Sequence, residues 1–222
     1  NVGILNSTGE YILFLDSDDY WDDNNFLYDL VQYIKKYPNI DYIFFRYKFY
    51  YQKKDKFIEP VFNIDDKEIK GKSGIECLDY ILSKMRDFQW YAWAGIVRRE
   101  FIINNDLFFM KDRNYEDALW TPQVFIKGRL IGFYNKPVYV YRLEREGQIT
   151  SDNSYKCLED SIFISTNWFD YLENHSIKES LKKDLLANIS QRYYHAIKYA
   201  GFLNNKEKRV IIEKIKENKN LL

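Results

Sequence analysis

The hydrophobic pattern of the first half of the chain alternates between strand-like runs and segments with helical spacing. Residues 11–15 form a continuous apolar run between Gly9 and a cluster of aspartates, which is typical of a strand buried on both faces at the centre of an α/β sheet. Apolar positions then recur at helical spacing over residues 26–34, and Pro38 ends that helix. Residues 40–51 are rich in aromatic and β-branched side chains and predict a strand.

The same alternation continues through the middle of the chain. Ser73 and Glu76 have the spacing of a capping box, which predicts a helix from there to about Arg86. The further elements expected are a short strand at 92–97, a brief helix from Arg99, a helix from Glu116 to Lys127 that Gly128 ends, and two short strands at 130–134 and 138–141 joined through residues 135–137.

Beyond Gly147 the pattern is helical throughout. Three helices are expected, over 158–172, over 181–197 behind a second capping box at 176–179, and over 205–219. We therefore predict an α/β domain over residues 1–150 and an α-helical C-terminal extension over residues 151–222. The apolar stripes of the extension are expected to pack on the domain or on a second copy of the chain.

The amino-acid composition limits the possible binding partners of the protein more than it limits its possible functions. Aromatic residues make up 18% of the chain, which indicates either walls that pack against flat ligands or an A+T-rich coding sequence. The formal net charge of +0 gives no overall field that would recruit nucleic acid or an anionic membrane. Cys77 and Cys157 lie far apart without metal-ligand spacing and are expected to be buried thiols in a reducing compartment. No run approaches the roughly 18 apolar residues that span a bilayer.

Acidic side chains cluster directly after the first predicted strand. Between Asn1 and Ile34 the chain has acids at seven positions and neither lysine nor arginine. Unit charges about 4 Å apart repel by about 4 kcal/mol at an effective dielectric near 20. Such a cluster therefore needs full solvation, protonation of some of its groups, or a cation among them.

Asp16 and Asp18 are the candidates for binding that cation. Two residues apart in an extended backbone, at the carboxyl end of a strand, they point the same way and can face one ion. Carboxylate oxygens are the ligands that Mg²⁺ or Mn²⁺ prefers. The alternative is a solvated acidic turn in which Asp19, Asp22 and Asp23 cap the following helix. We prefer this alternative for Asp22 and Asp23, and the metal for Asp16 and Asp18.

Four short blocks follow one another over residues 1–150. They are Asn1-Val2-Gly3 with Gly9-Glu10-Tyr11-Ile12 and Phe14-Leu15-Asp16-Ser17-Asp18-Asp19-Tyr20-Trp21, then Trp93-Ala94-Gly95-Ile96-Val97-Arg98-Arg99, then Tyr115-Glu116-Asp117, then Pro137-Val138-Tyr139-Val140-Tyr141-Arg142 with Gly147-Gln148-Ile149-Thr150. In this order they resemble family 2 glycosyltransferases of the GT-A fold, in which an Asp-x-Asp motif, an Arg-Arg segment, a Glu-Asp motif and a closing Tyr-Arg strand succeed one another. Ser7 and Thr8 replace the small residues that usually precede the glycine, and the helical extension adds nothing to the resemblance.

The resemblance implies an inverting glycosyltransferase. Such an enzyme moves a sugar from a nucleotide diphosphate sugar, here expected to be a UDP-sugar, to a hydroxyl of a glycan or lipid-linked acceptor in one metal-assisted displacement. It also implies a Rossmann-like GT-A domain, here expected to miss its first strands and most nucleotide-base contacts because residues 1–4 are not an initiator sequence. Whether such a piece is active alone stays open. Family habit points to bacterial cell-surface polysaccharide synthesis, in the cytoplasm at the inner face of the membrane.

The resemblance also implies roles for single residues. Asp18 is expected to be the principal ligand of Mn²⁺ or Mg²⁺, supported by Asp16. Asp117 is expected to be the general base, beside Glu116, which organises the acceptor. The expected donor contacts are Asp16, Ser17, Asp19 and Arg142, and the expected acceptor contacts are Trp93, Glu116 and Gln148. The two histidines of the chain, His175 and His195, lie in the extension and are not expected to bind metal.

Other interpretations stay open at this point. Glu116 and Asp117 also suit a helix start, where backbone donors hold a carboxylate ionised, so burial or Glu116 must raise the pKa of Asp117 again if it is a base. Arg142 fits a surface ion pair with Glu144 or Glu146 equally well, and Trp93 fits a core tryptophan.

Two rival functions compete with the transferase. A non-catalytic carbohydrate-binding or assembly module would fit the aromatic excess, although binding alone needs no base. A phosphatase with an Asp-x-Asp nucleophile is disfavoured, because Asp19-Tyr20-Trp21 follows where those sites need Thr or Gly. No nucleic-acid partner is expected, while peripheral membrane association and a homo-oligomer formed through the extension stay open.

Overall fold

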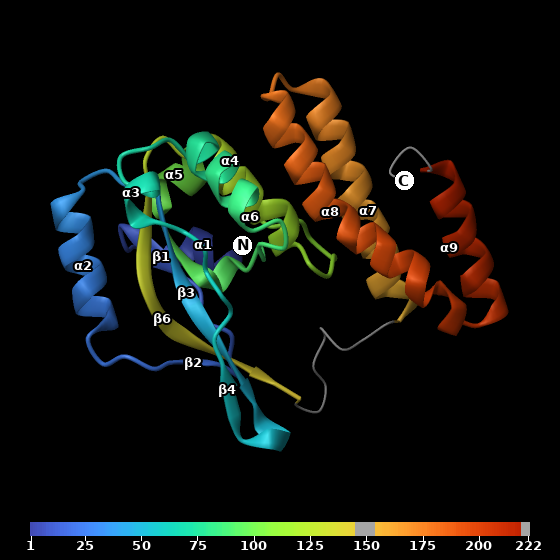
Figure 1. The fold of residues 1–222 in the computed structure, drawn as a ribbon, viewed down its shortest axis with the longest axis horizontal. Coiled ribbons are helices and arrows are strands. Elements are labelled where there is room, and N and C mark those ends of the chain that lie inside the picture. The colour runs from blue at the N-terminus through green and yellow to red at the C-terminus, as the bar shows by residue number, and fades with distance from the viewer. Residues whose placement is uncertain (145–153, 219–222) are drawn as a thin grey trace.

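The structure, a computed structural model, describes residues 1–144 and 154–218. One mixed sheet lies at the centre of the first part, with helices packed on both of its faces, and the chain continues into a group of C-terminal helices (Figure 1). This is the α/β domain followed by a helical extension that the sequence predicts.

The sheet formed by the described residues has six strands in the order β1-β5-β3-β6-β2, with β4 also paired to β3. They are β1 Tyr11–Leu13, β2 Tyr20–Trp21, β3 Tyr42–Tyr51, β4 Lys56–Ile58, β5 Gly95–Arg98 and β6 Ile131–Leu143. β3 and β6 run parallel, and the other neighbouring strands run antiparallel.

Helices cover the sheet and build the extension. They are α1 Val2–Asn6, α2 Phe26–Lys36, α3 Asp66–Ile69, α4 Gly74–Lys84, α5 Arg99–Asn104, α6 Asp117–Lys127, α7 Tyr155–Asn174, α8 Glu179–Tyr199 and α9 Asn205–Glu217. The buried side of α2 packs on one face of the sheet, and α4 and α6 pack on the other.

β3, rather than β1, is the central strand of the sheet. Tyr42 and Phe44 pack into the core with α4 and α6, whereas Ile43 and Phe45 pack against α2. The expectation that residues 11–15 form the central strand is wrong, because β1 pairs only with β5 among the described residues and ends the strand order. A short apolar run indicates burial, but it does not reveal how many neighbours the strand has.

β6 is one long strand where two short ones are expected. Its pairing register with β3 shifts beside Arg46, so that Asn135 and Lys136 fall outside the ladder. Pro137 has no N–H to donate to a ladder, and such an irregularity lets a strand continue past a proline. The joining segment is therefore a bulge within a strand and not a turn between two strands.

Most other boundaries agree with the sequence pattern. Ser73 and Glu76 make both hydrogen bonds of the expected capping box at the start of α4. The second capping box is wrong, because α8 begins at Glu179 with Lys178 before it and no side-chain cap. The expected strand at 92–97 begins with a 3₁₀ turn, Ala92–Ala94, before β5.

The helical extension packs on the α/β domain and shares its core. Trp168 of α7 is buried and donates its indole N–H to the Ala118 carbonyl, in the first turn of α6, at 2.9 Å. Leu181 and Leu185 of α8 lie in the same apolar cluster as Leu78 of α4. Figure 1 shows α7 and α8 side by side next to α4 and α6, with α9 beyond them. Of the two expected partners of the apolar stripes, the domain is confirmed for Leu172, Leu181, Leu185 and Ile189, whereas Leu158, Ile162 and Tyr193 pack within the extension against α9.

Two further expectations concern the burial of the cysteines and the length of apolar segments. Cys77 and Cys157 are free and buried, as the sequence indicates. Among the described residues, every helix is too short or too polar to cross a membrane.

Because residue 74 is glycine, the first turn of α4 can pack directly against the C-terminal end of α6. The Gly74 N–H donates to the Gly128 carbonyl at 2.8 Å. A Cβ at this position would lie 1.8 Å from the carbonyl oxygen of Phe125. The contact between the two helices therefore has no room for any side chain at residue 74.

We expect Gly74→Ala to destabilise the protein, although alanine normally favours a helix over glycine. The backbone of α6 must move away, which typically costs about 1–3 kcal/mol, or roughly 2–12 °C of melting temperature for a chain of this size. The matched control is Gly201→Ala, because a Cβ there has nothing within 4 Å. Thermal unfolding followed by circular dichroism checks this, and equal melting temperatures for the two variants would contradict it.

Candidate active site

A cleft of about 780 Å³ opens at the end of the sheet where β1 and β6 finish and β5 begins. Its other walls are the N-terminal end of α6 and one face of α8. The expected site residues that line it are Asp16, Ser17, Asp18, Trp93, Glu116 and Asp117. Residues that are distant in the sequence therefore meet in one cleft.

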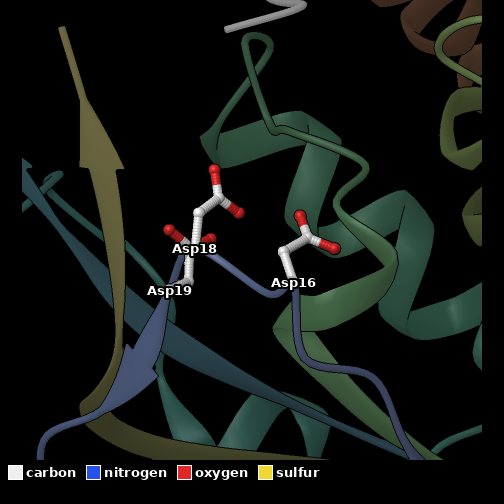
Figure 2. A group of neighbouring side chains, drawn as sticks. All are labelled: Asp16, Asp18 and Asp19. Carbon is white, nitrogen blue, oxygen red and sulfur yellow. The ribbon is translucent and has the colours of Figure 1, made fainter. Parts of the chain in front are cut away.

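Asp16, Asp18 and Asp19 lie on one turn between β1 and β2 (Figure 2). The Asp19 N–H donates to the Asp16 carbonyl at 3.1 Å and closes the turn. One carboxylate oxygen from each side chain lies within 4.8 Å of the others. The expected extended backbone is wrong, because a turn, rather than the pleat of a strand, brings the carboxylates together.

The buried hydroxyl of Tyr139 on β6 holds this turn in place. It donates to Asp19 Oδ2 at 2.8 Å and accepts from the Asp16 N–H at 3.2 Å. The Arg142 N–H donates to Asp19 Oδ1 at 2.9 Å. Burial raises the pKa of Tyr139 well above its usual value, so the hydroxyl stays protonated and remains a donor. Asp19 is thus tied to β6, while Asp16 and Asp18 line the cleft.

Trp93 forms the middle of an aromatic stack beneath the turn. Its ring lies 4.4 Å from that of Tyr91 and 4.1 Å from that of Tyr139, with interplanar angles of 11° and 12°. Only 6% of Trp93 is exposed. Although Trp93 lines the cleft, its position favours a packing role, in which it supports the ring that carries the Tyr139 hydroxyl.

Two expected donor contacts do not line the cleft. Asp19 is engaged with β6, and the Arg142 guanidinium lies against Gln52, with Nη2 3.5 Å from Oε1. Arg142 reaches the site through its backbone N–H alone. The expected acceptor contact Gln148 lies outside the described residues.

Asp22 and Asp23 do not line the cleft, but the expected helix cap is wrong for Asp22, because no side chain caps α2 and Asp22 bonds elsewhere. Asp22 forms an ion pair with Lys48. Asp23 accepts a hydrogen bond from the Asn25 N–H at 2.8 Å, directly before α2. Their carboxylates thus serve the local structure of the chain.

Two of the recognised sequence blocks build the scaffold around the cleft. Asn1 pairs with the backbone of Phe109, donating to its carbonyl at 2.8 Å and accepting from its N–H at 2.9 Å. Arg98 bonds to the fully buried carboxylate of Asp41 at 2.5 Å and thereby joins β5 to the start of β3. These residues fix the segments that carry the cleft and do not reach it themselves.

The three aspartates of the turn fit a hard divalent cation. Their ligand atoms are all carboxylate oxygens, which suit Mn²⁺ or Mg²⁺. Burial, followed by the neighbouring charges of Asp19, Asp18 and Glu116, raises the pKa of Asp16 to about 6. The part of this shift that comes from the neighbouring carboxylates is one that a cation would offset. No histidine belongs to this group among the described residues.

Asp117 and Glu116 stand at the start of α6 and line the same cleft. Burial raises the pKa of Asp117 to about 7; Arg192 and the Ala118 N–H act in the opposite direction, while Glu116 and Asp16 raise it further. Burial therefore has a larger effect on the pKa of this carboxyl than the helix-start donors have. A carboxylate with a pKa near neutrality is suited to accept a proton at physiological pH.

The helical extension holds the loop that leads into Glu116. The Asp160 carboxylate of α7 is fully buried and accepts from the Arg113 guanidinium at 2.8 Å and from the Asn114 N–H at 2.9 Å. Tyr115 has a φ of 60°, which is costly for a residue with a side chain. The Arg192 guanidinium of α8 lies 5.0 Å from the Tyr115 ring centroid. Two helices of the extension therefore fix the backbone immediately before the acidic pair.

The extension also lines the cleft, which the sequence interpretation missed. Asn188, Gln191, Arg192 and His195 of α8 belong to its wall. They are spaced i, i+3, i+4 and i+7, so they form a polar stripe on the helix beside its apolar stripe. That spacing is a signal the sequence contains, although nothing in it shows which surface the stripe faces. His175 does not line the cleft and stacks on Tyr171 instead.

Comparisons with known proteins identify relatives of this chain. Residues 1–88 match the family model described as glycosyl transferase family 2. The chain is 23% identical over 209 residues to the poly(ribitol-phosphate) β-N-acetylglucosaminyltransferase TarS of Staphylococcus aureus. That alignment covers 91% of this chain, and the chain spans about a third (33%) of the length of the curated relative.

Solved structures show the same fold. The crystal structure of S. aureus TarS 1–349 in complex with UDP-GlcNAc matches with a TM-score of 0.64 and 19% identity, over 98% of this chain and 59% of that one. The mannosyltransferase PcManGT from Pyrobaculum calidifontis, in complex with GDP-Man and Mn²⁺, matches with a TM-score of 0.50 and 13% identity, over 90% of this chain and 52% of that one. The expected GT-A fold with a helical C-terminal region is confirmed.

Removing the Tyr139 hydroxyl should loosen the aspartate turn without unfolding the sheet. In Tyr139→Phe the stacked ring remains, but Asp19 loses a donor and the Asp16 N–H loses its acceptor. We expect Mn²⁺ to bind about tenfold more weakly, as for other residues that orient metal ligands. Electron paramagnetic resonance of free Mn²⁺ measures this. Tyr47→Phe removes another buried hydroxyl from the same sheet and is the control; unchanged affinity in Tyr139→Phe would refute the role of the bond.

The raised pKa of Asp117 should make its ionisation destabilising. The folded state holds a proton on Asp117 up to about pH 7, whereas the unfolded chain releases it near the ordinary value, so stability falls as pH rises between these values. Asp117→Asn removes this loss. We expect its stability advantage to grow by about 1–2 kcal/mol from pH 5.5 to pH 8. Urea unfolding at the two pH values tests the sign, and an advantage independent of pH would show that the carboxyl titrates normally.

Proposed function

We propose that this chain, whose residues 1–88 match the model of glycosyl transferase family 2 and which has the GT-A fold, transfers a sugar from a nucleotide diphosphate donor to an acceptor hydroxyl, with inversion at the anomeric carbon. One observation carries this proposal. The turn with Asp16 and Asp18 and the acidic pair at the start of α6 line the same cleft. The cleft therefore contains a group that can hold a phosphate-binding cation and a group that can accept a proton. A donor and an acceptor bound together in the cleft could use both.

Asp16 and Asp18 would hold the cation, Mn²⁺ or Mg²⁺. When bound, it supplies Lewis-acid stabilisation of the negative charge that develops on the departing diphosphate. The solved structure of the Pyrobaculum mannosyltransferase, which contains Mn²⁺ and GDP-Man, supports this choice. The Tyr139 hydroxyl and the Arg142 N–H keep the turn fixed, so that the carboxylates need not reorganise when the donor binds.

Asp117 accepts the proton of the acceptor. The acceptor oxygen forms a bond to the anomeric carbon while the bond from that carbon to the diphosphate oxygen breaks, and the hydroxyl proton moves to Asp117. Attack on the face opposite the leaving diphosphate inverts the configuration. The pKa of Asp117, about 7, leaves a substantial fraction ionised at neutral pH while keeping the carboxylate basic. Glu116 would orient the acceptor by accepting a second hydrogen bond.

The donor proposed is a UDP-sugar, and the acceptor proposed is a hydroxyl of a polymer with polyol phosphate units. The staphylococcal relative is a poly(ribitol-phosphate) β-N-acetylglucosaminyltransferase, and its solved structure contains UDP-GlcNAc. Because the chain spans about a third of that relative, the activity is proposed for the protein that contains this chain.

Nucleotide release from a panel of UDP- and GDP-sugars, with and without Mn²⁺, tests the proposal. We expect release to need the cation and to fall at least about a hundredfold in Asp117→Asn, as is typical when a general base is removed. Asp18→Asn should weaken the response to Mn²⁺.

The matched control is Asp23→Asn, since Asp23 belongs to the same acidic segment but lies outside the cleft. The Asp23→Asn variant should release nucleotide at the same rate as the unmodified protein. Binding of a nucleotide sugar with neither hydrolysis nor transfer would instead identify a non-catalytic module, and equal turnover by Asp117→Asn and the unmodified protein would rule out the assigned base.

A further inference from the structure

The wall of the cleft formed by α8 carries one permanent positive charge. Four acids line the cleft, namely Asp16, Asp18, Glu116 and Asp117, and Arg192 is the single arginine or lysine among the lining residues. Within the described part of the chain, Arg192 makes no ion pair. Its guanidinium is half-buried and lies over the Tyr115 ring, 5.0 Å from the centroid. Among the described residues no carboxylate lies within ion-pair distance of this guanidinium, although its charge acts on Asp117 and lowers the pKa of that carboxyl.

The neighbours of Arg192 on α8 are already committed to the scaffold. The Asn188 side chain accepts from the Trp90 indole N–H at 2.6 Å and donates to the carbonyls of Arg86 and Phe88 at 2.7 and 3.0 Å. The Gln191 side chain donates to the Arg86 carbonyl at 3.4 Å. These bonds fix α8 against the segment before β5. The backbone at Arg192 is therefore held in place by the packing of the helix.

The described ring contact of Arg192 is with Tyr115, at the start of the segment that carries the acidic pair. In the proposed function the aspartate turn would hold the cation that offsets the charge of the donor diphosphate. Arg192 belongs with Tyr115, Glu116 and Asp117, where the proposed function puts the acceptor. A neutral glycan would offer this guanidinium no anionic group at hydrogen-bond distance. A phosphodiester would satisfy it, because the planar guanidinium matches two phosphate oxygens.

We propose that Arg192 of α8 binds a phosphate of the acceptor next to the attacking hydroxyl, so that the helical extension selects a phosphodiester polymer over a neutral glycan. This rests on the proposed function and deepens it, since it assigns the acceptor class to a residue outside the recognised sequence blocks. Arg192 is a specificity residue in this scheme, and Asp117 remains the base.

Transfer kinetics of Arg192→Gln test this with poly(ribitol phosphate) and with a phosphate-free glycan as alternative acceptors. We expect the KM for the polymer to rise about tenfold to a hundredfold, the range of a lost charge-assisted hydrogen bond. The fold-change in KM should be at least about ten times larger than the fold-change in kcat or in the rate of donor hydrolysis. Arg192→Lys should recover part of the affinity, because it keeps the charge and loses the planar fork.

The matched control is Arg209→Gln, the same chemical change at an exposed position of α9 outside the cleft. Its KM for the polymer should equal that of the unmodified protein. Two results would overturn the proposal. A shift of the pH profile with an unchanged KM would show that Arg192 acts on Asp117, and an equal loss of donor hydrolysis would show that it acts on the donor.

Failure of the proposed function would be visible separately. If the unmodified protein released no nucleotide from any donor, the transferase assignment would fail. Calorimetry would then measure the direct binding of poly(ribitol phosphate) to the unmodified protein and to Arg192→Gln. This comparison still tests whether Arg192 binds the phosphate. Equal binding of the polymer by both proteins would refute it.

Discussion

The electrostatic repulsion among four carboxylates in one cleft is the constraint on which the rest of the structure depends. Asp16 and Asp18 come from a turn after β1, and Glu116 and Asp117 from the start of α6. Their mutual repulsion, added to burial, appears as the raised pKa of Asp16 and of Asp117. A fold that keeps such a group together must supply rigid support to each segment and must leave room for a cation. Both conditions are met here.

Rigid support comes from side chains that pack against or bond to the segments that carry the acids. On one side, the stack of Tyr91, Trp93 and Tyr139 places a buried hydroxyl beneath the aspartate turn. On the other side, the buried Asp160 carboxylate fixes the backbone of residues 113–114. In each case a hydrogen bond to a backbone N–H or to a carboxylate determines where an acidic side chain sits. The same logic explains why the aromatic residues of the matched blocks are mostly packed against one another and not presented to a ligand.

The helical extension is part of the site as well as of the core. It buries Trp168 and Leu185 in the apolar cluster of the α/β domain, and it contributes a wall of the cleft through α8. Because one rigid helix both packs on the core and presents Arg192, the geometry of the acceptor side depends on how the extension docks. In the proposed function, sequence differences in such an extension would change acceptor binding while the aspartate turn and Asp117 stay the same.

The sequence by itself determined the local elements and the chemistry of the pairs. Helical spacing, a capping box and the stop signal at Gly128 located α2, α4 and α6 to within a few residues. The Asp-x-Asp and Glu-Asp pairs indicated a cation site and a base because their functional groups are encoded residue by residue. What needed the tertiary structure was every relation between distant segments: that β3 and not β1 is central, that Tyr139 holds the turn, that Arg142 works through its backbone, and that α8 faces the cleft. The physical reason is that hydrophobic periodicity reports which side of an element is buried, whereas the partner buried against it is chosen by the packing of the whole chain.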